Sequence, residues 1–346
     1  MPPLSLSAST PPAALAQLSV DAAVQFALDS VWGTALDGIA GLTGIDMLAS
    51  PFMQRAYLAA ICIAVIGALV GSFLVHREMA MIGDTLAHSA FAGVAVGLFV
   101  NATFSITVAP LLTALLVAAG AALLVQTLVD YAGAYRDTSL AIVLTGSFAV
   151  GSVLVTATDG GIAVGINAYL FGSLATVSRL NAAILVVLSV IVAAAVTVAY
   201  RPLVFVTFDT VGARAAGLNV TRYNQLLAVL TAVVVVGAMQ IMGVILVAAM
   251  LVIPVATATP VRGFKRAIAA AVGVGLLATT TGVTLSYQYD IAAGGTIVLV
   301  AIAIYAARTV GVRARHRLSR RSRAASATAD SHPAATDGEN DSQRRD

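Results

Sequence analysis

Long, uninterrupted runs of apolar side chains are the feature that most constrains what this chain can fold into. A helix needs about 20 apolar residues to cross the hydrocarbon core of a bilayer. Nine such runs lie at about 56–75, 84–101, 107–129, 139–157, 181–200, 223–239, 241–259, 267–285 and 291–310. Hydrophobic residues make up 59% of the sequence and charged residues only 10%, whereas soluble domains carry about 25% charged residues. The sequence therefore predicts an all-α, polytopic integral membrane protein and excludes a water-soluble globule.

The number of spans is less certain than their presence, and about eight to ten remain possible. Little but Gln240 separates the runs 223–239 and 241–259, so these two form the least certain pair. Residues 162–178 are apolar but short for a full crossing, and we expect a re-entrant or interfacial helix there.

The positions of the basic residues predict the orientation of the chain, because cytoplasmic connections carry an excess of arginine and lysine. The connections between the runs fall into two alternating sets, one on each side of the membrane. The first set contains only Arg55 and Arg179. The second set contains eight basic residues, namely Arg77, Arg136, Arg201, Arg214, Arg222, Arg262, Lys265 and Arg266. We therefore expect the second set to be cytoplasmic, the N-terminus outside and the C-terminus inside.

Composition divides the chain into three parts. Residues 1–54 hold four aspartates and no lysine or arginine, which suits a partly disordered extracytoplasmic extension, with 20–48 lying as a helix along the outer surface. Residues 55–312 contain the apolar runs and form the membrane domain. Residues 313–346 hold eight of the nineteen basic residues and almost no large apolar ones, which predicts a disordered, Arg-rich cytoplasmic tail.

Several kinds of chemistry are excluded by single residue counts. Cys62 is the one cysteine, so a disulfide framework and a cysteine-based zinc or iron–sulfur site are impossible. The one lysine, Lys265, follows Phe264, so no phosphate-binding G-x-x-x-x-G-K-[ST] loop exists. This chain therefore hydrolyses no ATP itself, and we expect it not to be an enzyme.

Asp84 and His88 are the ionisable residues that best fit a functional site inside the membrane. They lie four residues apart at the start of an apolar run, so a helix places both side chains on one face. A carboxylate and an imidazole together form half of a site for zinc, manganese or ferrous iron. The alternative interpretation is that Asp84 caps the helix and His88 bonds to a neighbouring carbonyl.

Residues 208–218 form a second candidate site, on the predicted cytoplasmic side. The segment is short and rich in small residues, and Gly217 followed by Asn219 indicates a helix stop. Such a helix can fit a groove on a cytoplasmic partner, through Asp209, Gly212, Arg214, Ala216 and Gly217. The alternative is an ordinary interfacial connector.

Several motifs, taken together, resemble one family. Residues 71–73 (Gly-Ser-Phe), Arg77, Met79 and residues 83–88 (Gly-Asp-Thr-Leu-Ala-His) closely resemble permease subunits of zinc and manganese ABC importers. Three further blocks agree in order and spacing: residues 167–172 (Asn-Ala-Tyr-Leu-Phe-Gly), 243–257 with Ile-Pro-Val-Ala at 253–256, and 289–294 (Tyr-Asp-Ile-Ala-Ala-Gly). The resemblance covers about 56–308, and the block ending at His88 is its most specific part.

The resemblance implies a homodimeric, mostly α-helical permease in the plasma membrane, driven by two copies of a separate cytoplasmic ATPase. An extracytoplasmic solute-binding protein would deliver the metal, and no nucleic acid would take part. By the same resemblance, Asp84 and His88 would be transient ligands on the path of a transported Zn²⁺ or Mn²⁺, with no cofactor bound permanently. Residues 208–218 would be the helix that docks on the ATPase.

The chain departs from the family pattern in its N-terminal extension, its Arg-rich tail, and Ser173, where many relatives have an acid. The main alternative is an ATPase-independent secondary metal transporter or channel, which several paired charges at mid-membrane would favour. A membrane anchor or assembly protein, and a permease for an iron chelate, are further alternatives. The last would want a wide aromatic-lined cavity, for which an aromatic content of 6% is low.

Overall fold

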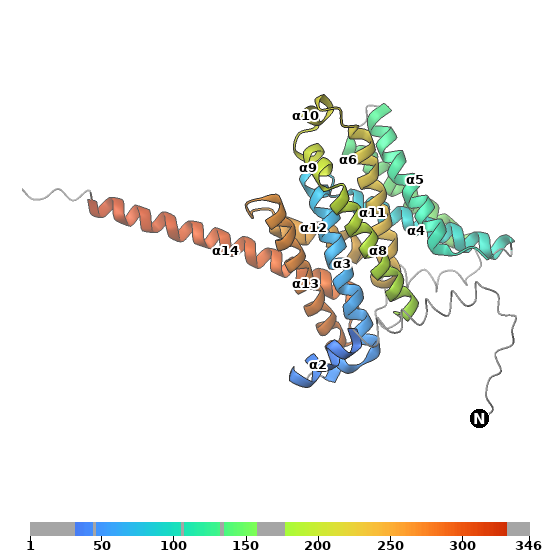
Figure 1. Cartoon of the computed structure of the whole chain (residues 1–346), viewed down its shortest axis with the longest axis horizontal. Helices are drawn as coiled ribbons and strands as arrows, with labels where there is room; N and C mark the ends of the chain where they lie inside the picture. Colours follow the sequence, from blue (N-terminus) through green and yellow to red (C-terminus); the bar gives the residue numbers. More distant parts are fainter. Residues whose placement is uncertain (1–31, 44–45, 105–106, 132–134, 158–176, 331–346) are drawn as a thin grey trace, which may run out of the picture. The chain divides into compact units, whose positions relative to one another are not determined.

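The computed structural model describes residues 32–43, 46–104, 107–131, 135–157 and 177–330, and within these ranges it contains helices and no strands (Figure 1). The predicted re-entrant helix, the block 167–172 and Ser173 therefore fall outside the described residues, apart from 177 and 178. The chain divides within its last helix: residues up to Ile304 belong to a helical bundle, and those from Tyr305 belong to a second unit. The predicted all-α, polytopic class is confirmed.

The helices follow the apolar runs of the sequence. They are α2 (Thr34–Thr43), the 3-10 helix η2 (Asp46–Ala49), α3 (Pro51–His76), α4 (Ile82–Phe104), α5 (Pro110–Tyr131), α6 (Arg136–Thr156), α8 (Arg179–Val198), α9 (Tyr200–Phe208), α10 (Thr210–Ala215), α11 (Val220–Met242), α12 (Val244–Ala258), α13 (Phe264–Tyr289) and α14 (Ala293–Asp330). All nine predicted runs are helical, and 8 helices among the described residues are long and apolar enough to cross a membrane. The ninth, α12, is shorter.

The break in the uncertain pair of runs lies at Gly243, inside the predicted run 241–259 and not at Gln240. This glycine has φ 80 and ψ 161, a backbone region that is essentially restricted to glycine. The helix that follows has 15 residues and is therefore about 22 Å long, less than the ~30 Å of a bilayer core. Gly243 thus ends α11 and precedes the shorter helix α12. The surrounding apolar residues give no other indication of a break.

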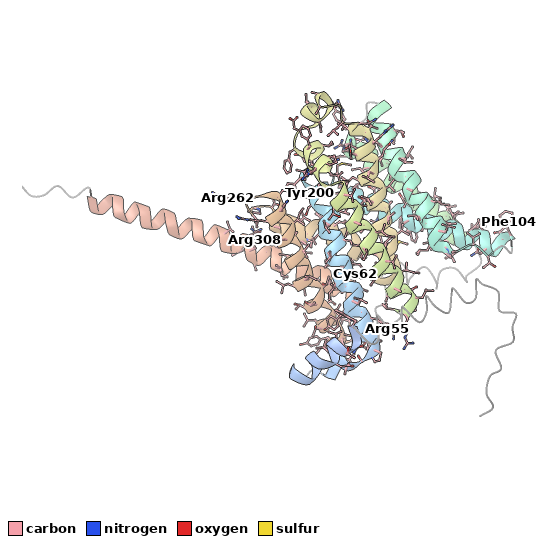
Figure 2. All side chains as sticks on the ribbon, viewed as in Figure 1. Arg55, Cys62, Phe104, Tyr200, Arg262 and Arg308 are labelled. Carbon is pink, nitrogen blue, oxygen red and sulfur yellow. The ribbon has the colours of Figure 1, made fainter. Side chains whose placement is uncertain are left out.

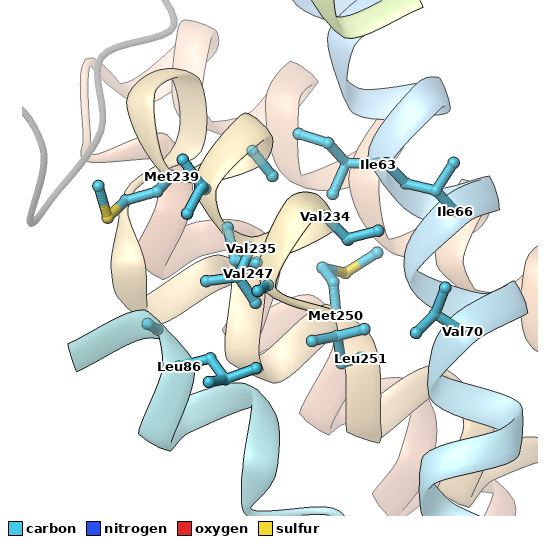
Figure 3. Close-up of a cluster of buried hydrophobic side chains, with 14 of the residues drawn as sticks. Ile63, Ile66, Val70, Leu86, Val234, Val235, Met239, Val247, Met250 and Leu251 are labelled. Atoms are coloured by element: carbon cyan, nitrogen blue, oxygen red, sulfur yellow. The ribbon is translucent and has the colours of Figure 1, made fainter. Parts of the chain in front are cut away.

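Small residues let α12 pack closely against α3 at the centre of the bundle (Figure 3). A Cβ atom added to Gly67 would lie 3.4 Å from the carbonyl oxygen of Met250, and one added to Gly71 would overlap the carbonyl oxygen of Leu251. Close backbone approach at small residues is a usual way to join helices in a membrane. Because Val75 of α3 also packs on the cluster that contains Val255 and Ala258 of α12, these contacts advance together along both helices. The two helices therefore run in the same direction.

One end of the bundle collects the basic residues that the sequence assigns to the cytoplasm. Arg77 follows α3, Arg136 begins α6, and Arg201, Arg214 and Arg222 lie on α9, α10 and the start of α11. Arg262, in the connection from α12 to α13, and Lys265 and Arg266, in the first turn of α13, complete the set. Arg55 lies at the other end of α3, and Figure 2 shows it far along the bundle from Tyr200.

The N-terminal extension is fastened to the opposite end of α3 through Gln54. The Gln54 side chain is 8% exposed, and its amide nitrogen donates to Asp37 Oδ1 at 2.8 Å and to the Leu48 carbonyl at 3.1 Å. Trp32 Nε1 donates to the Gln54 carbonyl at 2.8 Å. The predicted surface helix within 20–48 is thus represented by α2, held by specific hydrogen bonds.

The start of the predicted disordered tail is helical. Helix α14 continues to Asp330, so residues 313–330 extend a helix, and 331–346 lie outside the described residues. Arginine and alanine dominate this stretch, and both are strong helix formers. A segment with almost no large apolar residues can therefore still continue a helix that begins in an apolar run.

Candidate metal path and coupling site

Asp84 lies in the first turn of α4 and is not its cap. The helix begins at Ile82, and the amide of Thr85 donates to the Met81 carbonyl at 3.0 Å. Among the described residues, no backbone amide donates to the Asp84 carboxylate. An acid in the first turn is still favoured by the positive end of the helix dipole, so Asp84 stays available to bind a ligand.

The expected juxtaposition of Asp84 and His88 is present. His88 Nε2 lies 3.6 Å from Asp84 Oδ1, and the two side chains are 25% and 47% exposed, respectively. That separation is longer than a good hydrogen bond. Two ligands that each lie about 2.1 Å from a tetrahedral metal ion are about 3.4 Å apart. The two side chains are therefore spaced as ligands of one ion would be.

The second nitrogen of His88 points into the protein. His88 Nδ1 is buried and has no hydrogen-bond partner among the described residues. The imidazole packs edge-to-face on Phe148 of α6, with ring centroids 5.4 Å apart and an interplanar angle of 89°. Because the inner side of the ring is closed off, Nε2 is the nitrogen that faces Asp84.

Hydrogen bonds between α4 and α6 hold this pair in place. Thr85 Oγ1 donates to the Leu140 carbonyl at 3.3 Å, and the hydroxyls of Ser89 and Ser147 are 2.9 Å apart. Thr85 and Ser89 are fully buried. These contacts fix the rotation of α4, which leaves the Asp84 side chain half-exposed and the His88 ring packed on α6.

The described residues of one chain do not complete a metal site. No group of three or more His, Cys, Asp or Glu side chains gathers anywhere within the described ranges. Zinc sites ordinarily have three or four protein ligands, so two ligands with exposed side chains form at most half of one.

The second candidate site is a short capped helix, as the sequence predicts. Asp209 caps α10 by accepting a 2.7 Å hydrogen bond from the Gly212 amide. Gly217 has φ +82, and the Leu218 amide donates to the Ala213 carbonyl at 2.9 Å, so the helix stops where expected. The helix itself spans Thr210–Ala215, shorter than the predicted segment 208–218.

The five residues proposed for coupling form two groups, one that shapes the helix and one that is exposed. A Cβ atom at Gly212 would overlap the Asp209 carboxylate, so Asp209, Gly212 and Gly217 shape the helix. Arg214 and Ala216 are exposed and can contact a partner. Figure 1 shows α9 and α10 at the same end of the bundle.

Arg77 occupies a position between the two candidate sites. Its Nε donates to Thr207 Oγ1 at 2.9 Å, and its two terminal nitrogens donate to Asn224 Oδ1 at 2.7 Å and to the Leu203 carbonyl at 3.3 Å. Burial, and to a lesser degree the positive charge of Arg136, lowers the pKa of the Arg77 guanidinium to about 10. No role for Arg77 follows from the sequence alone, because its partners lie far along the chain.

The described helices define a multi-pass helical membrane protein. The model of the ABC 3 transport family matches residues 49–311. The chain belongs to the ABC 3 transport family, and the predicted family is confirmed.

Relatives and a solved structure agree with this assignment. The manganese transport system membrane protein MntC of Halalkalibacterium halodurans is 32% identical over 291 residues, which cover 82% of this chain and 97% of the relative. A probable metal transport system membrane protein of Treponema pallidum is 31% identical, over 75% of this chain and 94% of the relative. The structure of PsaBC from Streptococcus pneumoniae in complex with Fab matches with a TM-score of 0.67 and 27% identity, over 76% of this chain and 92% of that one.

Proposed function

We propose that this chain is the permease subunit of an ATP-driven importer that moves a divalent transition-metal ion into the cell. The observation that carries the proposal is the pair of Asp84 and His88, whose facing atoms are 3.6 Å apart, the spacing of ligands around one ion. Membership of the ABC 3 transport family and relatives named for manganese transport support it. The metal is cargo, and we propose no resident cofactor.

The exposed ligand pair supports a homodimer. Ionisable side chains in a membrane face the protein interior or a water-filled cavity, because exposure to lipid is costly. Asp84 is 47% exposed in a single chain, so a second copy is the natural group to cover it. A two-fold axis beside α4 would bring two carboxylates and two imidazoles together, which is the four-ligand set that one chain lacks.

The energy source and the delivery protein are separate subunits in this proposal. The sequence has no phosphate-binding loop, so a cytoplasmic ATPase would dock on α10 through its exposed Val211, Arg214 and Ala216. An extracytoplasmic metal-binding protein would supply the ion at the Gln54 end. We place the bundle in the plasma membrane with the Arg77 end inside, because eight basic residues gather there.

Manganese is the first ion to test, and zinc the second. The names of the relatives point to manganese, whereas a mixed nitrogen and oxygen site binds zinc more tightly than manganese by the usual order of affinities. Ferrous iron lies between them.

The experiment that tests the ligand assignment is Asp84→Asn. This change keeps the shape of the side chain but removes the charge that offsets a divalent cation leaving water. We expect Mn²⁺ or Zn²⁺ uptake to fall at least about tenfold, with His88→Ala giving a similar loss, while dimer and ATPase still co-purify. The matched control is Asp137→Asn, an exposed acid in the first turn of α6, which should be silent. Normal uptake by Asp84→Asn refutes the assignment, and uptake that persists without ATP hydrolysis favours the secondary transporter.

A further inference from the structure

The turn that joins α3 to α4 is fastened to two other helices by one side chain. Arg77 donates three hydrogen bonds, to Thr207 Oγ1 and the Leu203 carbonyl on α9 and to Asn224 Oδ1 on α11. All three acceptors are uncharged, and no carboxylate of the described residues lies within ion-pair distance. A half-buried cation without a counter-charge is expensive to keep, and neighbouring Arg136 raises that cost.

Two acceptors of Arg77, on Leu203 and Thr207, lie before the candidate coupling helix in the chain, and the third, on Asn224, lies after it. Thr207 is followed by Phe208 and then by Asp209, whose carboxylate caps α10. The Phe208 ring also packs edge-to-face on His76, the last residue of α3, with centroids 5.8 Å apart. A displacement of α10 therefore reaches the end of α3 through both a polar and an aromatic contact.

Along the chain, Arg77 is followed by a short connection and then by Asp84 and His88. The chain turns immediately after it, with the Met79 amide bonded to the Leu74 carbonyl at 2.9 Å and the Ile82 amide bonded to the Met79 carbonyl at 3.1 Å. Met79 is 5% exposed, so the turn is short and packed. Helix α4 begins at Ile82, two residues before Asp84. A movement of this connection therefore also moves the start of α4.

We propose that Arg77 is a positioning residue that links the movement of α10 to the Asp84–His88 pair and so couples ATP hydrolysis to metal release. This inference rests on the proposed function. A guanidinium suits the task because its planar fork holds five N–H donors in a fixed geometry, whereas a lysine ammonium is a compact charge on a flexible stem. Without it, the ATPase still docks and turns over, but α4 no longer follows.

The test compares metal transport with ATP hydrolysis in the same vesicles. The complete complex of permease, ATPase and metal-loaded binding protein is reconstituted, and Mn²⁺ uptake and phosphate release are measured together. For Arg77→Gln we expect unchanged basal hydrolysis and a fall of at least about tenfold in metal moved per ATP. Arg77→Lys should be intermediate. Arg222→Gln, an exposed arginine on the same helix as Asn224, is the matched control and should keep the wild-type ratio.

A second pair of changes keeps the proposal testable if Arg77→Gln does not assemble. Thr207→Val with Asn224→Leu leaves the arginine in place but removes two of its acceptors, and the ratio should again fall. A wild-type ratio in Arg77→Gln, or in the double variant when Arg77→Gln fails to assemble, overturns the coupling role. Failure of the proposed function is distinguishable, because it appears as normal uptake in Asp84→Asn or as no uptake of Mn²⁺ or Zn²⁺ by the wild type.

Discussion

Two aspartates near helix N-termini illustrate what single residues do in this protein. Asp209 accepts the 2.7 Å hydrogen bond that caps α10, and its charge is satisfied locally. Asp84 lies inside the first turn of α4, makes no capping bond within the described residues, and faces His88 at 3.6 Å. The same residue type therefore caps a helix in one place and faces an imidazole in the other.

Gly71 carries a prediction about stability at this scale. Gly71→Ala places a Cβ atom on the carbonyl oxygen of Leu251, so α3 and α12 must separate. Overpacking of this kind costs about 1–3 kcal/mol, and we expect a lower melting temperature of the purified protein in detergent. Gly273→Ala is the matched control, since a Cβ there meets nothing within 4 Å, and it should be neutral or slightly stabilising. Equal melting temperatures for both variants would contradict the close packing.

At the scale of elements, the N-terminal cap of α10 can be tested separately from its exposed surface. Asp209→Ala removes the cap, which typically costs about 1 kcal/mol of helix stability, and should reduce co-purification of the ATPase. Asp209→Asn keeps an equally good cap and should bind the ATPase normally. The comparison needs equal membrane levels of both variants. Normal binding by Asp209→Ala would show that α10 does not need to be ordered for docking.

The elements that the sequence predicts well are those set by local chemistry. Apolar length alone predicts all nine helical runs, and Gly217 predicts the end of α10 because its backbone adopts φ +82. Gly243 was not identified as a break, because apolar residues continue on both sides of it. The juxtaposition of Asp84 and His88 follows from their spacing. The Arg77 contacts join residues 77, 207 and 224 and depend on tertiary packing that no local pattern reports.

For the whole molecule, the proposed orientation predicts which surfaces an impermeant thiol reagent reaches. After Cys62→Ala removes the native thiol, Gly41→Cys on exposed α2 should react in intact cells. Lys265→Cys at the exposed start of α13 should react only after lysis. Labelling efficiency relative to a membrane-permeant reagent provides the measurement. The reverse pattern would contradict the proposed orientation. It would place α10 outside the cell, where a cytoplasmic ATPase could not bind it.

The direction of α12 fixes the end of the bundle at which the next helix begins. Helix α11 begins beside Arg77, where Asn224 bonds to it, and α12 runs parallel to α3, back toward that same end. Although α12 has only 15 residues, it therefore reverses the direction of the chain as a full crossing would. The chain therefore returns to the Arg77 end of the bundle before α13 begins. The first residues of α13 accordingly lie beside the end of α3, where the Phe264 ring packs edge-to-face on His76 with centroids 5.2 Å apart.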